Sequence, residues 1–206
     1  MWNVDCTIAT VVDCALVVVA LVASPVIMFA FKGRWKPWYD SLVKAPWNPP
    51  DAVFGIVWTL LYLLIGAAGI TARYYYEQPS NSASFAVSAS ATVLYYVMWA
   101  LLLSWTPVFF LLRSIIGALV ILIFIVLVSV TTDALFWVIH SLPGGLLLPH
   151  LVWIFYALSL NIYIVAKNGA KLRQEDAQPI SEQVATGKRS KSPKAGRNGG
   201  GGGFMN

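Results

Sequence analysis

Five long apolar stretches constrain the fold of this chain more than any other feature. They cover residues 7–31, 51–72, 84–112, 114–139 and 145–166, and a helix needs about 20 mostly apolar residues to cross a bilayer. Charged residues make up only 11% of the 206 residues, whereas a soluble domain carries about a quarter. The sequence therefore predicts an all-α membrane protein that folds as a bundle of five transmembrane helices.

The distribution of basic residues predicts the orientation of these helices. With five spans, Arg73 is the one basic residue on the side of the N-terminus. The other side receives all the rest, which are Lys32, Arg34, Lys36, Lys44, Arg113 and every Lys and Arg from Lys167 onward. Cytosolic loops of membrane proteins are enriched in Lys and Arg. We therefore expect an exoplasmic N-terminus and a cytosolic C-terminus.

The end of the chain differs in composition from the apolar part. Residues 169–206 are polar, basic and rich in glycine, so they cannot bury enough apolar surface to fold alone. We divide the chain into a five-helix domain, residues 1–168, and a disordered basic tail, residues 169–206. The segment "GKRSKSPKAGR", residues 187–197, either rests on anionic lipid head groups or is solvated without a role.

The segment "KAPWNPPDAVFGIVWTLLY", residues 44–62, combines the start of the second span with several aromatic residues. Asn48 is a suitable N-cap, Pro49 suits the first helical position, and the Asp51 carboxylate suits the first turn. These residues predict a helix start without a functional role.

The aromatic residues that follow are spaced for one helical face. Phe54, Trp58 and Tyr62 are four residues apart, so they lie one above the other. They either pack against a neighbouring helix or form the wall of a pocket for a flat, apolar ligand. In the third span, Pro107 is expected to loosen the backbone.

The fifth span has a similar row. Trp153, Ala157 and Asn161 are four residues apart, and a polar residue at membrane depth usually points into the bundle. Asn161 is therefore either a hydrogen-bonding link between helices or a ligand contact. Further along, Leu160, Tyr163 and Lys167 fit a pattern proposed for cholesterol contact, although Tyr163 and Lys167 also suit an interfacial anchor and a stop-transfer charge.

The sequence contains no motif for metal binding, phosphate binding or nucleophilic catalysis. There is no Cys/His cluster at metal spacing, no Gly-rich phosphate loop and no Ser/His/Asp set. We therefore predict no metal, no obligatory cofactor and no catalytic residues. The basic residues lie in loops and tail, which predicts no nucleic acid partner. His150, beside Pro149, is expected to open the fifth helix, and Asp13 and Asp133 to lie near exoplasmic ends where water reaches them.

Three segments carry a resemblance to a known family. "WYDSLVKAPWNPPDAVFGIVWTLLY", residues 38–62, closely resembles the first loop and second helix of the tryptophan-rich sensory protein/translocator protein (TspO/MBR) family. "WTPVFF", residues 105–110, and "LPHLVWIFYALSLN", residues 148–161, resemble the corresponding family segments in the same order. The resemblance covers about residues 7–168 and does not include the tail.

The resemblance implies a five-helix bundle of the TspO/MBR type, a homodimer in membrane lipid, with a pocket near the first loop. It implies a receptor or carrier that binds porphyrin, haem or sterols and takes part in tetrapyrrole or sterol transport. The membrane would be the mitochondrial outer membrane in a eukaryote, and the outer or cell membrane in a bacterium. The implied ligand-binding residues are Trp38, Tyr39, Trp47, Trp58, Tyr62, Trp105, Trp153, Ala157 and Asn161. The implied sterol-contact residues are Leu160, Tyr163 and Lys167.

The chain also departs from the family pattern. Met98 and Leu102 stand where the family usually carries Gln and Asn, and His150 stands where a Tyr is common. Two other functions stay open. One is light-dependent porphyrin degradation, with Trp58 and Trp153 as participants, and the other is a scaffold that acts through the basic tail.

Overall fold

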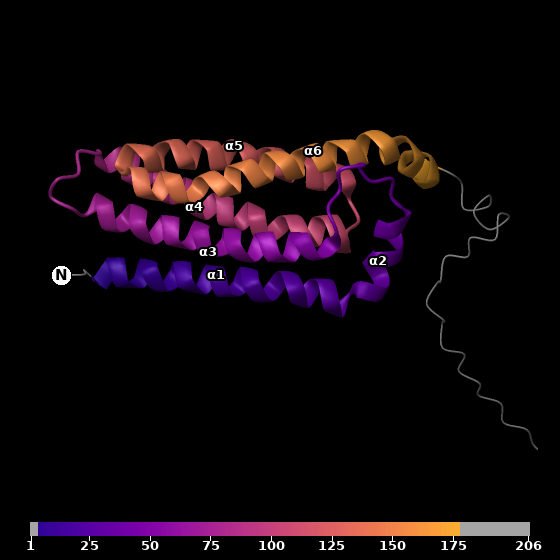
Figure 1. Cartoon of the computed structure of the whole chain (residues 1–206), viewed down its shortest axis with the longest axis horizontal. Helices are drawn as coiled ribbons and strands as arrows, with labels where there is room; N and C mark the ends of the chain where they lie inside the picture. Colours follow the sequence, from indigo (N-terminus) through magenta and orange to yellow (C-terminus); the bar gives the residue numbers. More distant parts are fainter. Residues whose placement is uncertain (1–3, 178–206) are drawn as a thin grey trace, which may run out of the picture. The chain divides into compact units, whose positions relative to one another are not determined.

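A computed structural model describes residues 4–177 of the chain, which form an all-helical bundle (Figure 1). The elements in chain order are α1 (Val4–Ala30), α2 (Lys32–Ser41), α3 (Asp51–Tyr76), α4 (Phe85–Thr106), the π-helical turn η1 (Pro107–Leu111), α5 (Ile115–Ile139) and α6 (Ser141–Ala177). Within the described residues, five helices are long and apolar enough to cross a membrane. The predicted five-helix membrane bundle is therefore confirmed.

The predicted tail lies mostly outside the described residues. One compact unit ends at Ala170, and the α6 helix continues to Ala177. The segment 187–197, for which two interpretations were open, lies outside the described residues.

The fifth span begins earlier than predicted. Helix α6 starts at Ser141 and contains Pro149 in its interior, so His150 does not open the helix. Pro143 lies in the first turn, where a missing N–H costs little. His150 is instead fully buried, and its Nε2 lies 3.1 Å from the Ser129 Oγ of α5. It therefore links α5 to α6.

The start of α3 also differs from the prediction in detail. Pro50, not Asn48, is the N-cap, and Asp51 is the first helical residue. A residue that precedes proline is disfavoured in the helical region, so both Asn48 and Pro49 stay outside the helix. Asn48 donates a hydrogen bond to the Pro49 carbonyl oxygen at 3.0 Å. The expected place of Asp51 in the first turn is confirmed.

Helix α2 was not predicted. It lies at the end of the bundle where α1 ends and α3 begins (Figure 1), and we call this end the α2 end. Its buried residues, Trp35 and Tyr39, are four positions apart and face the bundle. The Trp35 indole N–H donates to the Met28 carbonyl oxygen of α1 at 2.9 Å, which holds α2 against α1.

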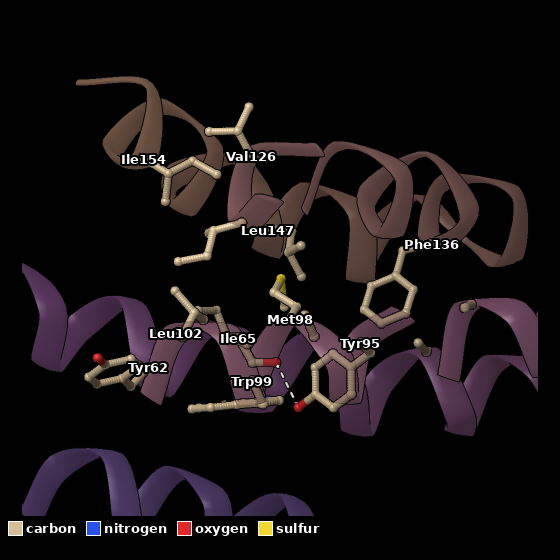
Figure 2. Packing of buried hydrophobic residues seen from close by; sticks show 14 of the residues in the cluster. Tyr62, Ile65, Tyr95, Met98, Trp99, Leu102, Val126, Phe136, Leu147 and Ile154 are labelled. Atoms are coloured by element: carbon tan, nitrogen blue, oxygen red, sulfur yellow. Dashed lines mark hydrogen bonds between the residues drawn. The ribbon is translucent and has the colours of Figure 1, made fainter. Parts of the chain in front are cut away.

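The core is built around α4. Tyr95, Met98, Trp99 and Leu102 of this helix are all buried, and Figure 2 shows them between α3 and the two last helices. The Tyr95 hydroxyl donates to the Ile65 carbonyl oxygen of α3 at 3.3 Å. Met98 and Leu102, the departures from the family pattern, are therefore apolar core residues, and Leu102 also borders the cavity described below.

Helix α1 is attached to the bundle by a buried ion pair in its first half. The Asp13 carboxylate is fully buried and paired with the Arg73 guanidinium of α3. The Tyr96 hydroxyl of α4 donates to Asp13 Oδ1 at 3.3 Å. The expectation that water reaches Asp13 and Asp133 is wrong, because helix packing leaves them 0% and 7% exposed. The ion pair joins α1 to α3 and α4.

A close contact between helices lies near this ion pair. A Cβ at Gly66 of α3 would lie 2.4 Å from Cγ2 of Val17 in α1, far inside van der Waals contact. Gly66 therefore lets the first half of α1 approach α3 closely, and a larger residue there would push the two helices apart.

Candidate ligand-binding cavity

A cavity of about 410 Å³ lies at the α2 end of the bundle, and all six α-helices and η1 contribute residues to its lining. Its size falls within the range of small-molecule sites, roughly 300–1,000 Å³. Nine aromatic residues line it, namely Phe29, Trp35, Tyr39, Phe54, Trp58, Tyr62, Trp105, Phe109 and Phe110. The cavity is therefore an aromatic-lined, largely apolar space.

The first wall is the aromatic face of α3. Phe54, Trp58 and Tyr62, which the spacing placed on one face, all line the cavity. The Trp58 and Tyr62 rings stack at 5.3 Å with an interplanar angle of 30°, and Tyr62 stacks in turn on Trp99 at 5.7 Å. Trp58 and Tyr62 therefore give the cavity an aromatic side, and Trp99 packs behind Tyr62 outside the lining.

The second wall comes from the end of α4 and from η1. Trp105 and Phe109 stack at 5.0 Å with an interplanar angle of 12°, and Phe110 lies edge-on to Phe109 at 4.8 Å. Pro107 has no N–H to bond within the helix, and the backbone from Pro107 to Leu111 is π-helical. The predicted loosening at Pro107 is confirmed. The extra residue in this turn changes the register, and both phenylalanines line the cavity.

Helix α2 covers the end of the cavity. Trp35 and Tyr39 line it, and the Trp35 ring lies 4.9 Å from Phe110. Burial raises the pKa of the Tyr39 hydroxyl above its ordinary value, because the phenolate is disfavoured away from water. Sequence reasoning missed Trp35, although its spacing of four from Tyr39 was a usable signal.

The mostly apolar lining also contains a few polar groups. Asn161 of α6 is 2% exposed, and its Oδ1 has no hydrogen-bond partner among the described residues. The Trp105 indole N–H also lacks a partner there. A buried polar atom without a partner is costly, so a ligand that bonds to Asn161 would remove this cost. Of the two interpretations of Asn161, this geometry favours ligand contact.

The structure brings six of the nine predicted ligand-binding residues to the cavity. These are Tyr39, Trp58, Tyr62, Trp105, Ala157 and Asn161. The other three lie outside the lining. Trp38 packs edge-on against Phe109 at 5.5 Å, Trp47 is 50% exposed, and Trp153 packs edge-on against Phe54 at 5.8 Å. Trp38 and Trp153 therefore support lining residues from outside.

The predicted sterol-contact residues do not lie together. Leu160 is buried and lines the cavity. Tyr163 instead packs against Trp47 at 5.3 Å, and the Lys167 ammonium lies 5.7 Å from the centre of the Tyr163 ring. This arrangement favours an anchoring role for Tyr163 and Lys167, and it leaves Leu160 as the one member of the pattern in the cavity.

Residues 42–50, which connect α2 to α3, are fastened to α6. The Val43 N–H donates to Asn168 Oδ1 at 2.9 Å, and Asn168 Nδ2 donates back to the Val43 carbonyl oxygen at 3.0 Å. The Tyr156 hydroxyl donates to the Trp47 carbonyl oxygen at 2.7 Å. On the other side, the Lys36 ammonium of α2 lies 3.4 Å from an Asp51 carboxylate oxygen. Together these contacts hold the connection over the end of the cavity.

The variant Asn168→Ala is expected to free this connection. It removes both hydrogen bonds to Val43, each worth about 0.5–1.5 kcal/mol, so the Val43 amide should exchange its hydrogen about 10-fold faster or more. Hydrogen exchange followed by mass spectrometry measures this. Asn81→Ala is a matched control, because Asn81 also makes two backbone hydrogen bonds, to Ile139 and Ala83. Unchanged exchange at Val43 in Asn168→Ala would contradict the role given to Asn168.

The described residues contain no group of three or more His, Cys, Asp or Glu side chains placed to hold a metal ion. Among the described lining residues, Asp51 is the only one with a formal charge at neutral pH. What the cavity offers a ligand is therefore stacking surface and a few hydrogen bonds.

Comparison with known proteins identifies similar chains. Residues 14–166 match the family described as the TspO/MBR family. The chain is 30% identical to Protein CrtK of Rhodobacter capsulatus over 62% of its own length and 76% of the relative. It is 32% identical to the tryptophan-rich sensory protein of Cereibacter sphaeroides over 64% and 77% of the two chains. It is also 30% identical to the human translocator protein over 66% and 78%.

Proposed function

The chain belongs to the TspO/MBR family, and on that premise we propose that it is a membrane receptor or carrier that binds hydrophobic planar ligands in its aromatic cavity. The ligands would be porphyrins, haem or sterols, and the role would lie in their transport or sensing. The observation that carries the proposal is the cavity itself, with the stacked rings of Trp58 and Tyr62 on one side and those of Trp105 and Phe109 on the other.

The energetics of such a site suit a flat ligand. Each ring contact of this kind is worth about 0.5–1.5 kcal/mol beyond the burial of area. Micromolar affinity corresponds to about 8 kcal/mol, and burial of an apolar ligand supplies roughly 25 cal/mol for each Å². Two stacking walls and an apolar envelope therefore favour the binding of a flat, apolar ligand.

We also propose that the α2 end faces the cytosol. The hydrogen bond from Arg113 Nη2 to the Arg34 carbonyl oxygen, at 2.6 Å, supports the placement of these two basic residues at one end of the bundle. Arg73, the basic residue assigned to the other side, is paired with Asp13. Its charge is therefore neutralised within the fold, which strengthens the asymmetry on which the orientation rests.

A titration of the full chain in lipid nanodiscs tests the proposed function. Protoporphyrin IX, or the fluorescent sterol dehydroergosterol, is added while the tryptophan fluorescence is recorded. Saturable quenching is expected for at least one of the two, since several tryptophans lie at or beside the cavity. Quenching that rises linearly for both ligands, without saturation, would defeat the proposal. A loss of porphyrin absorbance under light that depends on the protein would instead support the degradation alternative.

A further inference from the structure

Between α1 and α3, residues that line the cavity are also exposed on the outer surface of the bundle. Phe29 of α1 lines the cavity and is 77% exposed. Gly55 and Thr59 of α3 also line the cavity and are exposed. All three lie in helices that are long and apolar enough to span a membrane. Their outer surfaces therefore face lipid, and each of the three residues borders both the cavity and the bilayer.

The two halves of α1 are held differently. The first half is fastened by the Asp13–Arg73 ion pair and by the close contact of Val17 with Gly66. In the second half, Leu21, Ser24 and Met28 border the cavity. Figure 1 shows α1 at the edge of the bundle, beside α3. In the most apolar 18-residue stretch of α1, 11% of the residues are buried inside the bundle. This is the lowest share among the five candidate membrane spans of the described residues.

Pro25 lies between the fastened part and the end of α1. A proline inside a helix removes one backbone hydrogen bond and weakens the helix at that point. The segment from Pro25 to the end of α1 can therefore move relative to α3 while the first half stays in place.

The α2 end of the cavity is closed by one aromatic contact and by several polar ones. Trp35 packs on Phe110, Lys36 pairs with Asp51, and Asn168 holds the backbone at Val43 through two hydrogen bonds. Entry from water would require these contacts to break. Entry from lipid requires apolar side chains to move apart, together with a shift or loss of the one hydrogen bond from Trp35 to the Met28 carbonyl oxygen.

On the basis of the proposed function, we infer that the ligand enters and leaves through a lateral portal between α1 and α3, bordered by Phe29, Gly55 and Thr59. The ligand is then a molecule dissolved in the bilayer, and the second half of α1 is the gate. A bilayer-dissolved ligand also suits a lining whose described residues include no cationic side chain.

The variant Gly55→Phe tests the portal. A Cβ at Gly55 meets no atom within 4 Å, so the fold accommodates a side chain there, and a phenyl ring would obstruct the portal. The full chain in proteoliposomes is mixed with vesicles that contain dehydroergosterol, and energy transfer from tryptophan gives the rates. We expect association and dissociation both to slow about 10-fold while Kd changes little, since an obstructed route acts on both rates.

Gly145→Phe is the matched control. A Cβ at Gly145 of α6 also meets no atom within 4 Å, and Gly145 does not line the cavity, so its rates should equal those of the unmodified chain. The converse variant, Phe29→Ala, removes a ring from the portal and should speed both rates.

Three outcomes overturn the inference, and they differ from failure of the proposed function. Unchanged rates in both Gly55→Phe and Phe29→Ala would exclude the portal although the sterol binds. A faster association rate in Asn168→Ala, together with unchanged rates in Gly55→Phe, would place the route at the α2 end. A loss of affinity in Gly55→Phe with an unchanged association rate would show that the ring fills the cavity instead of its entrance. If the unmodified chain takes up neither dehydroergosterol nor protoporphyrin IX saturably, the proposed function itself fails.

Discussion

Replacement of Asp13 by alanine is expected to destabilise the bundle by about 3–5 kcal/mol, the usual cost of removing one partner from a buried ion pair. Asp13 is fully buried and meets the Arg73 guanidinium and the Tyr96 hydroxyl. Without the carboxylate, the Arg73 charge stays largely removed from water and unpaired. The effect should be among the largest of any single substitution, because the pair joins three helices. Unfolding in mixed detergent micelles measures it.

The double variant Asp13→Ala/Arg73→Ala distinguishes the energy of the ion pair from the other effects of each substitution. If the two groups act as a pair, the double variant loses less stability than the sum of the single variants, and the difference gives the coupling energy. Asp133→Ala is a matched control, because Asp133 is also buried and its Oδ1 has no hydrogen-bond partner among the described residues. An Asp13→Ala variant as stable as the unmodified chain would refute the fastening of α1 by this pair.

Replacement of Trp58 by alanine is expected to weaken ligand binding by at least about 10-fold, which corresponds to about 1.4 kcal/mol. Trp58 stacks on Tyr62 at 5.3 Å and forms part of the flat wall of the cavity. Its loss removes both a stacking contact and a large apolar surface, and fully burying such a side chain is worth about 1.5–3 kcal/mol. The dissociation constant for protoporphyrin IX or dehydroergosterol, from fluorescence titration, gives the result.

Trp47→Ala is the control for this experiment. Trp47 belongs to the same sequence segment and to the same family pattern, but it lies outside the lining and is 50% exposed. Its replacement should change the affinity less than threefold, within the spread of measured interface effects that are near neutral. Equal losses in the two variants would show that binding does not depend on the cavity, and a larger loss in Trp47→Ala would place the site on the outer surface.

The spans could be predicted from the sequence because they follow from length and apolar composition alone. Their ends could not, since these depend on local backbone restrictions. The double proline at 49 and 50 keeps Asn48 outside α3, and Pro143 suits a first turn that begins at Ser141. Helix α2 was missed because its ten residues include three basic ones and a proline. It forms because Trp35 and Tyr39 bury their rings in the bundle.

The cavity could be predicted in part, and the reason lies in helical geometry. A row of residues at i, i+4 and i+8 turns by about 80° around the helix axis, since each residue advances about 100°. On α3, all three residues of the row border the cavity. On α6, Ala157 and Asn161 border it, but Trp153 turns away and packs against Phe54. Sequence spacing gives a face, and the neighbouring helices decide which part of that face is open.

The partners of charged residues could not be predicted at all. Asp13 and Arg73 are 60 positions apart, and their meeting depends on how α1 packs against α3. The sequence therefore suggested that water solvates the Asp13 carboxylate. In the structure the carboxylate is buried and pairs with the Arg73 guanidinium. The same holds for Asn168 and Val43, whose hydrogen bonds span 125 positions.

The most direct test of the central claim is an experimental structure of the chain with bound dehydroergosterol or protoporphyrin IX. We expect ligand density within the cavity, between the Trp58–Tyr62 wall and the Trp105–Phe109 wall, in hydrogen-bonding reach of Asn161. Density on the outer surface beside Tyr163 and Lys167, with the cavity empty, would contradict it.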